Sequence, residues 1–275
     1  MRRTGSSLLL THLVLASWSL IVLFPIWTLI INSFKIQKDI FADPFGLPHK
    51  YTFNGYVSAW TEGRFDLYFF NTINVTVTSL ILILLIGSMA AYALAKWKSW
   101  VSGFLYIFFI AGIMIPIRLG TIDLVRLISA LNLQNRLESL IPVYVAMGLP
   151  IATFVLTAFI RSLPSEMFDA AKVDGASEWR IYTSIVLPLL RPALATVAIF
   201  NMIKIWNDFW FPLVFIRAQQ SRTIALGVSL LFGQYRTDWN KALSVLSLAV
   251  IPILLLYVLL SREFIKGLTA GATKG

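Results

Sequence analysis

Residues 165–192, SEMFDAAKVDGASEWRIYTSIVLPLLRP, lie between two long apolar runs and form the longest polar segment in the second half of the chain. The pattern predicts two short helices joined at a glycine. Ser165 is expected to cap the first helix, because its hydroxyl accepts a free first-turn N–H. Gly175 takes the left-handed conformation that closes this helix. Ser177 caps the second helix, and Pro188, which has no N–H to donate, ends it.

The composition of the chain fixes its class. Hydrophobic residues make up 58% of the 275 residues and charged residues only 13%, well outside the balance of a soluble domain. There is no cysteine, which excludes disulfides, thiolate chemistry and cysteine-based metal sites. The net charge of +10 is explained by Lys and Arg beside membrane spans, and no nucleic acid is expected as a partner. The sequence therefore predicts an all-α polytopic membrane protein in contact with membrane lipid.

Six apolar runs have about the 20 residues that a hydrocarbon core of about 30 Å requires. The predicted spans are Leu8–Ile31, Asn71–Ala95, Trp100–Ile117, Ser139–Ile160, Ala193–Ile216 and Ala242–Leu260. Between the first two spans, a turn-rich external loop is expected to hold one short helix, at 56–60. An amphipathic connector is expected at 118–138.

In the second span, Gly87, Ala91 and Ala95 recur every four residues, a pattern that lets helices pack closely in lipid. In the fifth span, Asn201, Lys204 and Asp208 fall at i, i+3 and i+7, on one face of a continuous helix. A charge within the bilayer should face protein or water. Two interpretations of this stripe stay open: it lines a translocation pathway, or Lys204 and Asp208 neutralise each other.

The segment 165–192 resembles the coupling loop of ATP-binding-cassette importer permeases, known as the EAA loop. The resemblance lies in seven positions at fixed spacing, with Asp169 where the family usually has Glu. These positions are Asp169, Ala170, Ala171, Gly175, Ile185, Leu187 and Pro188. The resemblance implies that residues 162–192 form a cytoplasmic loop that docks on an ATPase subunit.

Two further stretches are similar to the sugar-importer permeases of the maltose-system second-subunit type. Trp206–Phe209 reads WNDF, and the tail 262–275 reads REFIKGLTAGATKG. Asn207 of this stretch lies beside the polar stripe, so the candidate pathway residues are Asn201, Lys204, Asn207 and Asp208. The likeness also implies a cytoplasmic tail that contacts the ATPase through Lys266, Gly267, Leu268 and Gly271.

Taken together, the resemblances imply that residues 1–275 form a single permease domain of the type I importer fold. Its expected partners are a homologous second permease, an ATPase dimer that carries ATP and Mg, and an extracytoplasmic sugar-binding protein. The chain itself is expected to bind no cofactor or metal and to have no catalytic residue. Lys and Arg are divided equally between the two predicted sides, so the coupling loop alone places both termini in the cytoplasm of a bacterial or archaeal cell.

The sequence lacks the pattern GxxxxGK[ST], so the chain is not an ATPase of that type. It also lacks HExxH and GxSxG, which argues against a membrane protease. The alternatives to an importer subunit are a stand-alone secondary transporter driven by an ion gradient and an intramembrane enzyme. No internal repeat is evident, which weakens the first of these alternatives.

Overall fold

The computed structural model describes residues 5–232 and 237–272, with side chains at 8–232, 237–259, 261 and 262. Over these ranges the chain is helical and forms no strand, which confirms the predicted all-α class. The α-helices are α1 (Gly5–Ser33), α2 (Gln37–Ala42), α3 (Asn54–Thr61), α4 (Phe65–Lys96), α5 (Trp100–Met114), α6 (Thr121–Ala130), α7 (Leu140–Arg161), α8 (Ser165–Val173), α9 (Glu178–Ile181), α10 (Leu187–Leu189), α11 (Arg191–Trp206), α12 (Trp210–Phe215), α13 (Ile224–Ser229) and α14 (Trp239–Ala272). A π-helical segment, Tyr182–Val186, joins α9 to α10.

Four of the described helices are long and apolar enough to cross a membrane, and they match the first, second, fourth and sixth predicted spans. They cover Leu8–Ser33, Phe65–Lys96, Leu137–Arg161 and Trp239–Leu259. Two bent pairs bring the number of candidate spans to six if each pair is one span. These are Trp100–Met114 with Ile117–Ala130, bent by 85°, and Glu178–Leu189 with Arg191–Trp206, bent by 71°. The protein is therefore a polytopic helical membrane protein.

The fifth span was predicted to be one continuous helix, but the structure shows two. Helix α11 ends at Trp206, and a separate short helix, α12, begins at Trp210. Pro212 explains the break, because it has no N–H to bond the carbonyl of Asp208 four residues earlier. The third span was predicted to run to Ile117 and to end near Pro116, and helix α5 stops slightly earlier, at Met114.

The connections between the spans contain helices, of which some were predicted and one was not. The predicted surface helix at 56–60 is present as α3, and the amphipathic connector contains α6. Helix α2 was not predicted. Helix α4 begins at Phe65, six residues before the predicted start, because Phe65 and Tyr68 are buried and Asp66 complements the positive end of the helix.

The chain divides into two compact units. The first contains the described residues up to Asp66 and those from Gly227 to Ile251. Inside it, the side chain of Asn240 donates to the carbonyls of Ser33 at 2.9 Å and of Lys35 at 2.8 Å. The ammonium of Lys35, which is 1% exposed, donates to the carbonyl of Asp43 at 2.6 Å. These bonds satisfy a backbone that turns sharply after α1.

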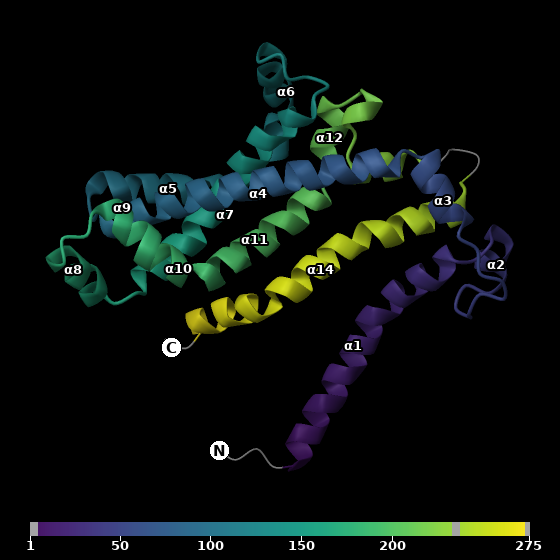
Figure 1. Cartoon of the computed structure of the whole chain (residues 1–275), viewed down its shortest axis with the longest axis horizontal. Coiled ribbons are helices and arrows are strands. Elements are labelled where there is room, and N and C mark those ends of the chain that lie inside the picture. The colour runs from purple at the N-terminus through teal and green to yellow at the C-terminus, as the bar shows by residue number, and fades with distance from the viewer. Residues whose placement is uncertain (1–4, 233–236, 273–275) are drawn as a thin grey trace. The chain divides into compact units, whose positions relative to one another are not determined.

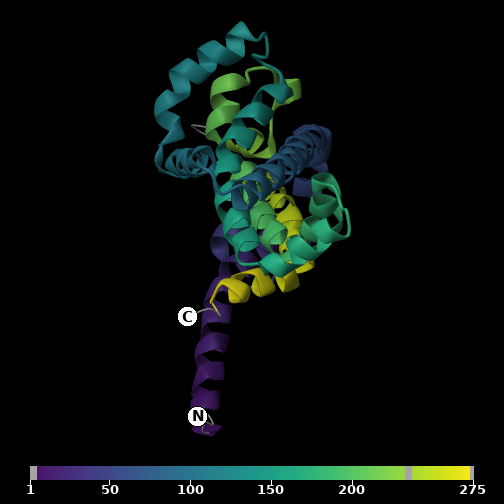
Figure 2. The same ribbon diagram turned by 90° about the vertical axis from the view of Figure 1, so that its left-hand side faces the viewer.

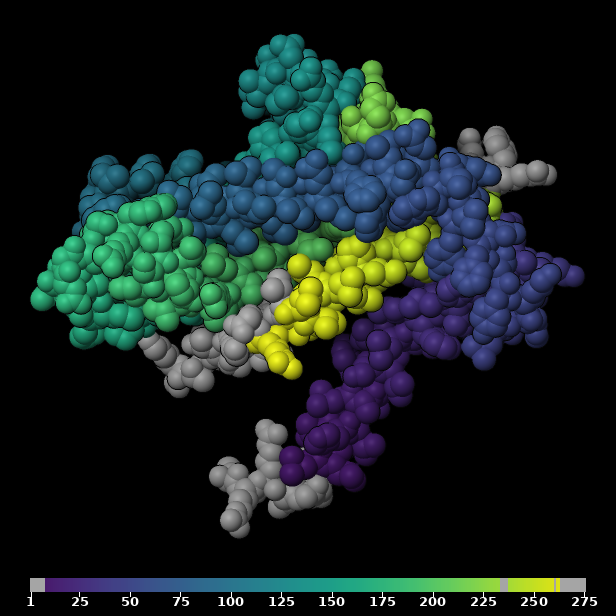
Figure 3. Space-filling view, viewed as in Figure 1, coloured from purple at the N-terminus to yellow at the C-terminus, as the bar shows by residue number. Residues whose placement is uncertain are grey.

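The second unit contains the residues from Leu67 to Leu226 and those from Pro252 onward. Within it, α7 packs against α5 and α11, and α8 to α10 lie together at one end (Figure 1). Figure 2 views the chain from this end, and in Figure 3 the atoms of α8 to α10 form the left-hand end of the unit.

Glycines let the helices of the second unit approach closely. A Cβ added at Gly87 of α4 would lie 2.8 Å from the Cβ of Ala152 on α7. A Cβ at Gly148 of α7 would lie 2.8 Å from both Ile83 Cγ1 and Asn201 Oδ1. The predicted small-residue stripe is thus confirmed as a helix contact at Gly87, and Ala91 in the same stripe is fully buried.

Candidate functional site: the coupling hairpin and its anchor

Residues 162–192, which we call the coupling hairpin, begin with helix α8. Gly175 has φ +74°, as predicted, and two hydrogen bonds close the helix around it. The N–H of Gly175 donates to the carbonyl of Lys172 at 3.0 Å, and the N–H of Ala176 donates to the carbonyl of Ala171 at 2.9 Å. This pair of bonds is a Schellman motif, which satisfies carbonyls that would otherwise be unpaired.

The prediction that Ser165 caps α8 is wrong. Ser165 is the first helical residue, and the preceding Pro164 occupies the capping position without a side-chain bond. A capping residue needs non-helical angles, and Pro164 adopts them with φ −59° and ψ 133°. The predicted cap of α9 is confirmed, since the hydroxyl of Ser177 accepts from the N–H of Arg180 at 3.3 Å.

Pro188 does not end the second helix, contrary to the prediction. The chain passes from α9 through the π-helical segment into α10, and Pro188 lies inside α10. The wider π turn just before Pro188 accommodates its ring and its missing N–H, a common way to relieve this conflict. The bend follows at Leu190, before Pro192 in the first turn of α11.

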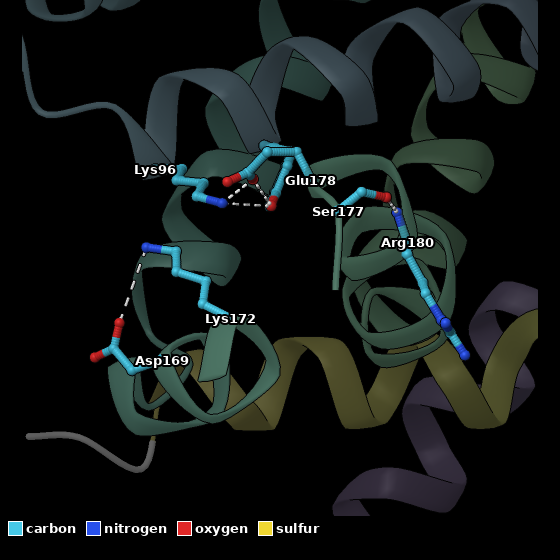
Figure 4. A network of polar contacts seen from close by, with 7 residues as sticks. Lys96, Asp169, Lys172, Ser177, Glu178 and Arg180 are labelled. Atoms are coloured by element: carbon cyan, nitrogen blue, oxygen red, sulfur yellow. Dashed lines mark hydrogen bonds and ion pairs between the residues drawn. The ribbon is translucent and has the colours of Figure 1, made fainter. Parts of the chain in front are cut away.

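A polar seam fixes the hairpin to the end of α4, and sequence reasoning missed it. The hydroxyl of Tyr92 donates to Glu178 Oε2 at 2.8 Å, and Lys96 forms an ion pair with the same oxygen (Figure 4). One helical turn earlier, Ser88 and Tyr182 share a hydrogen bond of 2.8 Å between two buried side chains. Polar residues at 88, 92 and 96, spaced by four, were the signal that the sequence offered.

The predicted coupling positions divide between two faces of the hairpin. Ala171 is buried, and Ile185 and Leu187 are partly buried against the hydrophobic core of the second unit. The exposed positions are Asp169, Ala170, Gly175 and Pro188.

Two large apolar side chains share the exposed face: Val173 is 88% exposed and Trp179 is 62% exposed. Exposed apolar side chains beside small residues are typical of a surface that binds another protein. The hairpin therefore has an anchored side and a side available to a partner.

The predicted pathway residues do not form one stripe, because α11 ends at Trp206. Asn201 is buried and 3% exposed, whereas Lys204 is exposed, with its ammonium 4.2 Å from the centre of the Phe200 ring. Asp208 lies beyond the helix, where its carboxylate accepts from the hydroxyl of Tyr144 at 2.9 Å.

The carboxylate of Asp208 has a second donor, the N–H of Phe211, at 3.2 Å. No ion pair joins Lys204 to Asp208 in the part of the chain that the structure describes. The mutual neutralisation of these two residues is therefore not observed. Asn207 is exposed at the end of α11, and its side chain donates to the carbonyl of Ile203 at 2.9 Å.

The tail is only partly described. The backbone of α14 is helical to Ala272. Gly267 and Gly271 are part of this helical backbone, whereas the side chains of Lys266 and Leu268 lie outside the described part of the chain.

The fold defines a polytopic helical membrane protein whose hairpin is anchored on one side and exposed on the other. Residues 83–266 match the family of binding-protein-dependent transport system inner membrane components, and the chain belongs to this family. It is accordingly a component of a transporter and not an enzyme.

A curated relative in this family is the diacetylchitobiose uptake system permease protein NgcG of Streptomyces coelicolor. It is 34% identical over 264 residues, which cover 95% of this chain and 87% of the relative. Two solved structures share the fold. One is a bacterial ABC transporter involved in the import of the acidic polysaccharide alginate, with a TM-score of 0.82, 19% identity and coverage of 96% of this chain and 99% of the other.

The other structure is a bacterial alginate ABC transporter in complex with an alginate pentasaccharide-bound periplasmic protein. It has a TM-score of 0.67 and 16% identity, and it covers 94% of each chain. Both likenesses confirm the predicted permease fold of ABC importers.

Proposed function

We propose that this permease carries a sugar or a related carbohydrate across the membrane and couples that transport to a partner ATPase. The observation that carries the proposal is the coupling hairpin, which presents an exposed face while a polar seam fixes its other side to a spanning helix. The similar NgcG protein is named for diacetylchitobiose uptake, and the solved transporters for alginate, which supports a carbohydrate as cargo.

The proposed assembly contains a homologous second permease, an ATPase dimer and an extracytoplasmic sugar-binding protein. The complex of a similar transporter with a periplasmic protein supports the last of these partners. ATP and Mg are held by the ATPase, and this chain binds neither. Both termini and the hairpin lie in the cytoplasm, where ATP is available.

The seam passes the motion of the ATPase to the membrane helices. When ATP binding closes the ATPase dimer, the exposed face of the hairpin moves with it. Glu178 is bonded to both Tyr92 and Lys96, so α4 follows the hairpin instead of sliding past it. The bundle then changes from inward-facing to outward-facing as a set of rigid helices.

Asn201, Lys204, Asn207 and Asp208 are proposed to line the pathway. Sugar hydroxyls need hydrogen-bond donors and acceptors, and these four side chains supply both. Tyr144 holds the carboxylate of Asp208 in place from the neighbouring helix α7. The tail residues Lys266, Gly267, Leu268 and Gly271 are proposed to contact the ATPase.

Reconstitution in proteoliposomes tests the proposal. Sugar uptake should require ATP, the ATPase, the second permease and the binding protein together. Uptake by this chain alone, driven by an ion gradient, would show a secondary transporter instead.

A seam variant tests the coupling route in the same assay. Glu178→Ala should lower uptake more than ATP hydrolysis, because the hairpin still docks but no longer pulls α4. Glu138→Ala removes an equal charge far from the hairpin in sequence and should leave the ratio of uptake to hydrolysis unchanged. Equal ratios in the two variants would contradict the coupling role of the seam.

A further inference from the structure

A cavity of about 740 Å³ lies between α8 and the ends of the neighbouring spans. Its walls come from the last turn of α4, the first turn of α5, the last turn of α7 and one side of α8. This volume is within the range of small-molecule sites in proteins. The cavity is not part of the proposed sugar pathway, since none of the four proposed pathway residues lines it.

The cavity walls carry more positive than negative charge. Four basic side chains line the cavity, namely Lys96, Lys98, Arg161 and Lys172, against one lining carboxylate, Asp169. Lys96 is already paired with Glu178, so the excess positive charge comes from the other three. Figure 4 shows Lys96 and Lys172 on the two sides of the space between α4 and α8.

The existing contacts leave much of this charge uncompensated. Lys172 and Asp169 are 3.9 Å apart, and both side chains are more than half exposed, so this pair is weak. The guanidinium of Arg161 donates to the carbonyl of Leu94 at 3.3 Å and lies 4.6 Å from the ring centre of Tyr106, and no ion pair joins it to a described residue.

Two polar groups in the cavity have no hydrogen-bond or ion-pair partner among the described residues. One is the ammonium of Lys98. The other is the hydroxyl of Ser165, which lines the cavity and does not cap its helix. Both are available to an anionic oxygen. The first turn of α8 adds backbone N–H groups, which favour negative charge.

Exposed tryptophans place the cavity at the level of lipid headgroups. Trp97 and Trp100, on either side of Lys98, are 55% and 82% exposed. Only the residues from Trp97 to Ser99 separate α4 from α5. Tryptophan is enriched where a bilayer meets water, and basic pockets between spanning helices on the cytoplasmic side bind anionic headgroups.

We propose that this cavity binds the phosphate group of an anionic molecule. At this depth the nearest source is the headgroup of an anionic phospholipid such as phosphatidylglycerol, and the other source is free phosphate. Lys98, Lys172, Arg161 and the hydroxyl of Ser165 contact the phosphate oxygens. A phosphate here also relieves the repulsion between the neighbouring lysines on α4 and α8.

Native mass spectrometry of the assembled transporter tests the site, with phosphatidylglycerol and phosphatidylcholine offered in turn. The wild type should retain phosphatidylglycerol and not phosphatidylcholine. Each basic residue near a surface strengthens binding to an anionic lipid about fivefold, so Lys98→Gln combined with Lys172→Gln should lower retention roughly thirtyfold. The matched control is Arg191→Gln, which removes one exposed charge from the start of α11 outside the cavity and should leave retention unchanged.

Inorganic phosphate distinguishes the two sources. If millimolar phosphate displaces the lipid from the wild type, or protects the wild type but not the double variant against heat, the site is confirmed and takes soluble phosphate too. If phosphate has no effect while the lipid is retained, the lipid is the ligand. Equal retention by the wild type and the double variant, or no binding of either ligand, would overturn the proposal.

Retention by the permease pair that disappears once the ATPase is added would also overturn it, because an acidic segment of the ATPase would then fill the cavity. If the double variant does not assemble, Lys98→Gln alone gives the same test with about a fivefold loss. This substitution removes a side chain that has no partner among the described residues, so folding should be unaffected.

Discussion

Replacing Gly175 should uncouple transport from ATP hydrolysis, to a degree set by the backbone angle at this position. Gly175 has φ +74°, where residues with a side chain other than Asn or Asp cost roughly 1–2 kcal/mol and β-branched residues more. A Cβ at this position would meet no atom within 4 Å, so the cost comes from the backbone and not from a clash.

We expect Gly175→Val to destabilise the closed form of the turn at the end of α8 by about 1–3 kcal/mol. The chain escapes this strain by opening the turn, which breaks the two hydrogen bonds that close α8. Since each 1.4 kcal/mol is a factor of 10 in an equilibrium constant, the ratio of closed to open hairpin would fall about fivefold to 140-fold. Membrane insertion should be unchanged, because Gly175 is exposed at the surface.

The assay is sugar uptake together with ATP hydrolysis stimulated by the binding protein, in proteoliposomes. Gly175→Asn is the matched control, because Asn tolerates the left-handed conformation. The Asn variant should retain most of the activity, and the activity of Gly175→Ala should lie between those of the Asn and Val variants. Near wild-type uptake in the Val variant would refute the coupling role of the hairpin. Equal damage by Asn and Val would show that bulk on the docking face matters and that the backbone angle does not.

Three further outcomes are expected. An impermeant thiol reagent added outside should label Thr61→Cys and not Val173→Cys in a chain that has no native cysteine; the reverse pattern would invert the topology. Gly148→Ala should lower the free energy of unfolding by about 1–3 kcal/mol, because the new methyl group overlaps Ile83, whereas Gly103→Ala, with open space around it, should be neutral or stabilising in a thermal melt. Tyr144→Phe should reduce uptake, because the carboxylate of Asp208 loses one hydrogen-bond donor. Unchanged uptake would show that this hydrogen bond is not needed for sugar transport.

Most spans could be predicted because an apolar run of sufficient length has one stable arrangement in lipid. The closure at Gly175 was also predictable, since a left-handed angle requires a particular residue type. The break in the fifth span was predictable as well: Pro212 stands in the sequence, and its effect on the carbonyl of Asp208 follows from the missing N–H. The prediction failed because hydrophobicity over 193–216 was given more weight than this proline.

The seam between α4 and the hairpin was not predictable in the same way. Tyr92 and Glu178 are far apart in sequence, and each alone is an ordinary residue near the end of a helix. Their role depends on a tertiary contact that neither local pattern specifies. Pro188 shows a similar limit, because no local sequence pattern specifies the preceding π-helical segment, in which Tyr182 and Val186 are buried.

The bend at Leu190 determines the direction in which a push from the hairpin reaches the membrane. The segment Glu178–Leu189 and helix α11 meet at 71°, which is nearer to a right angle than to a straight line. A displacement along the first segment therefore has its larger component across the axis of α11 and its smaller component along it. Under the proposed coupling, the bend therefore converts a displacement of the hairpin into a sideways movement of the helix that carries Asn201. If the helix were straight here, the same displacement would move Asn201 only along the helix axis.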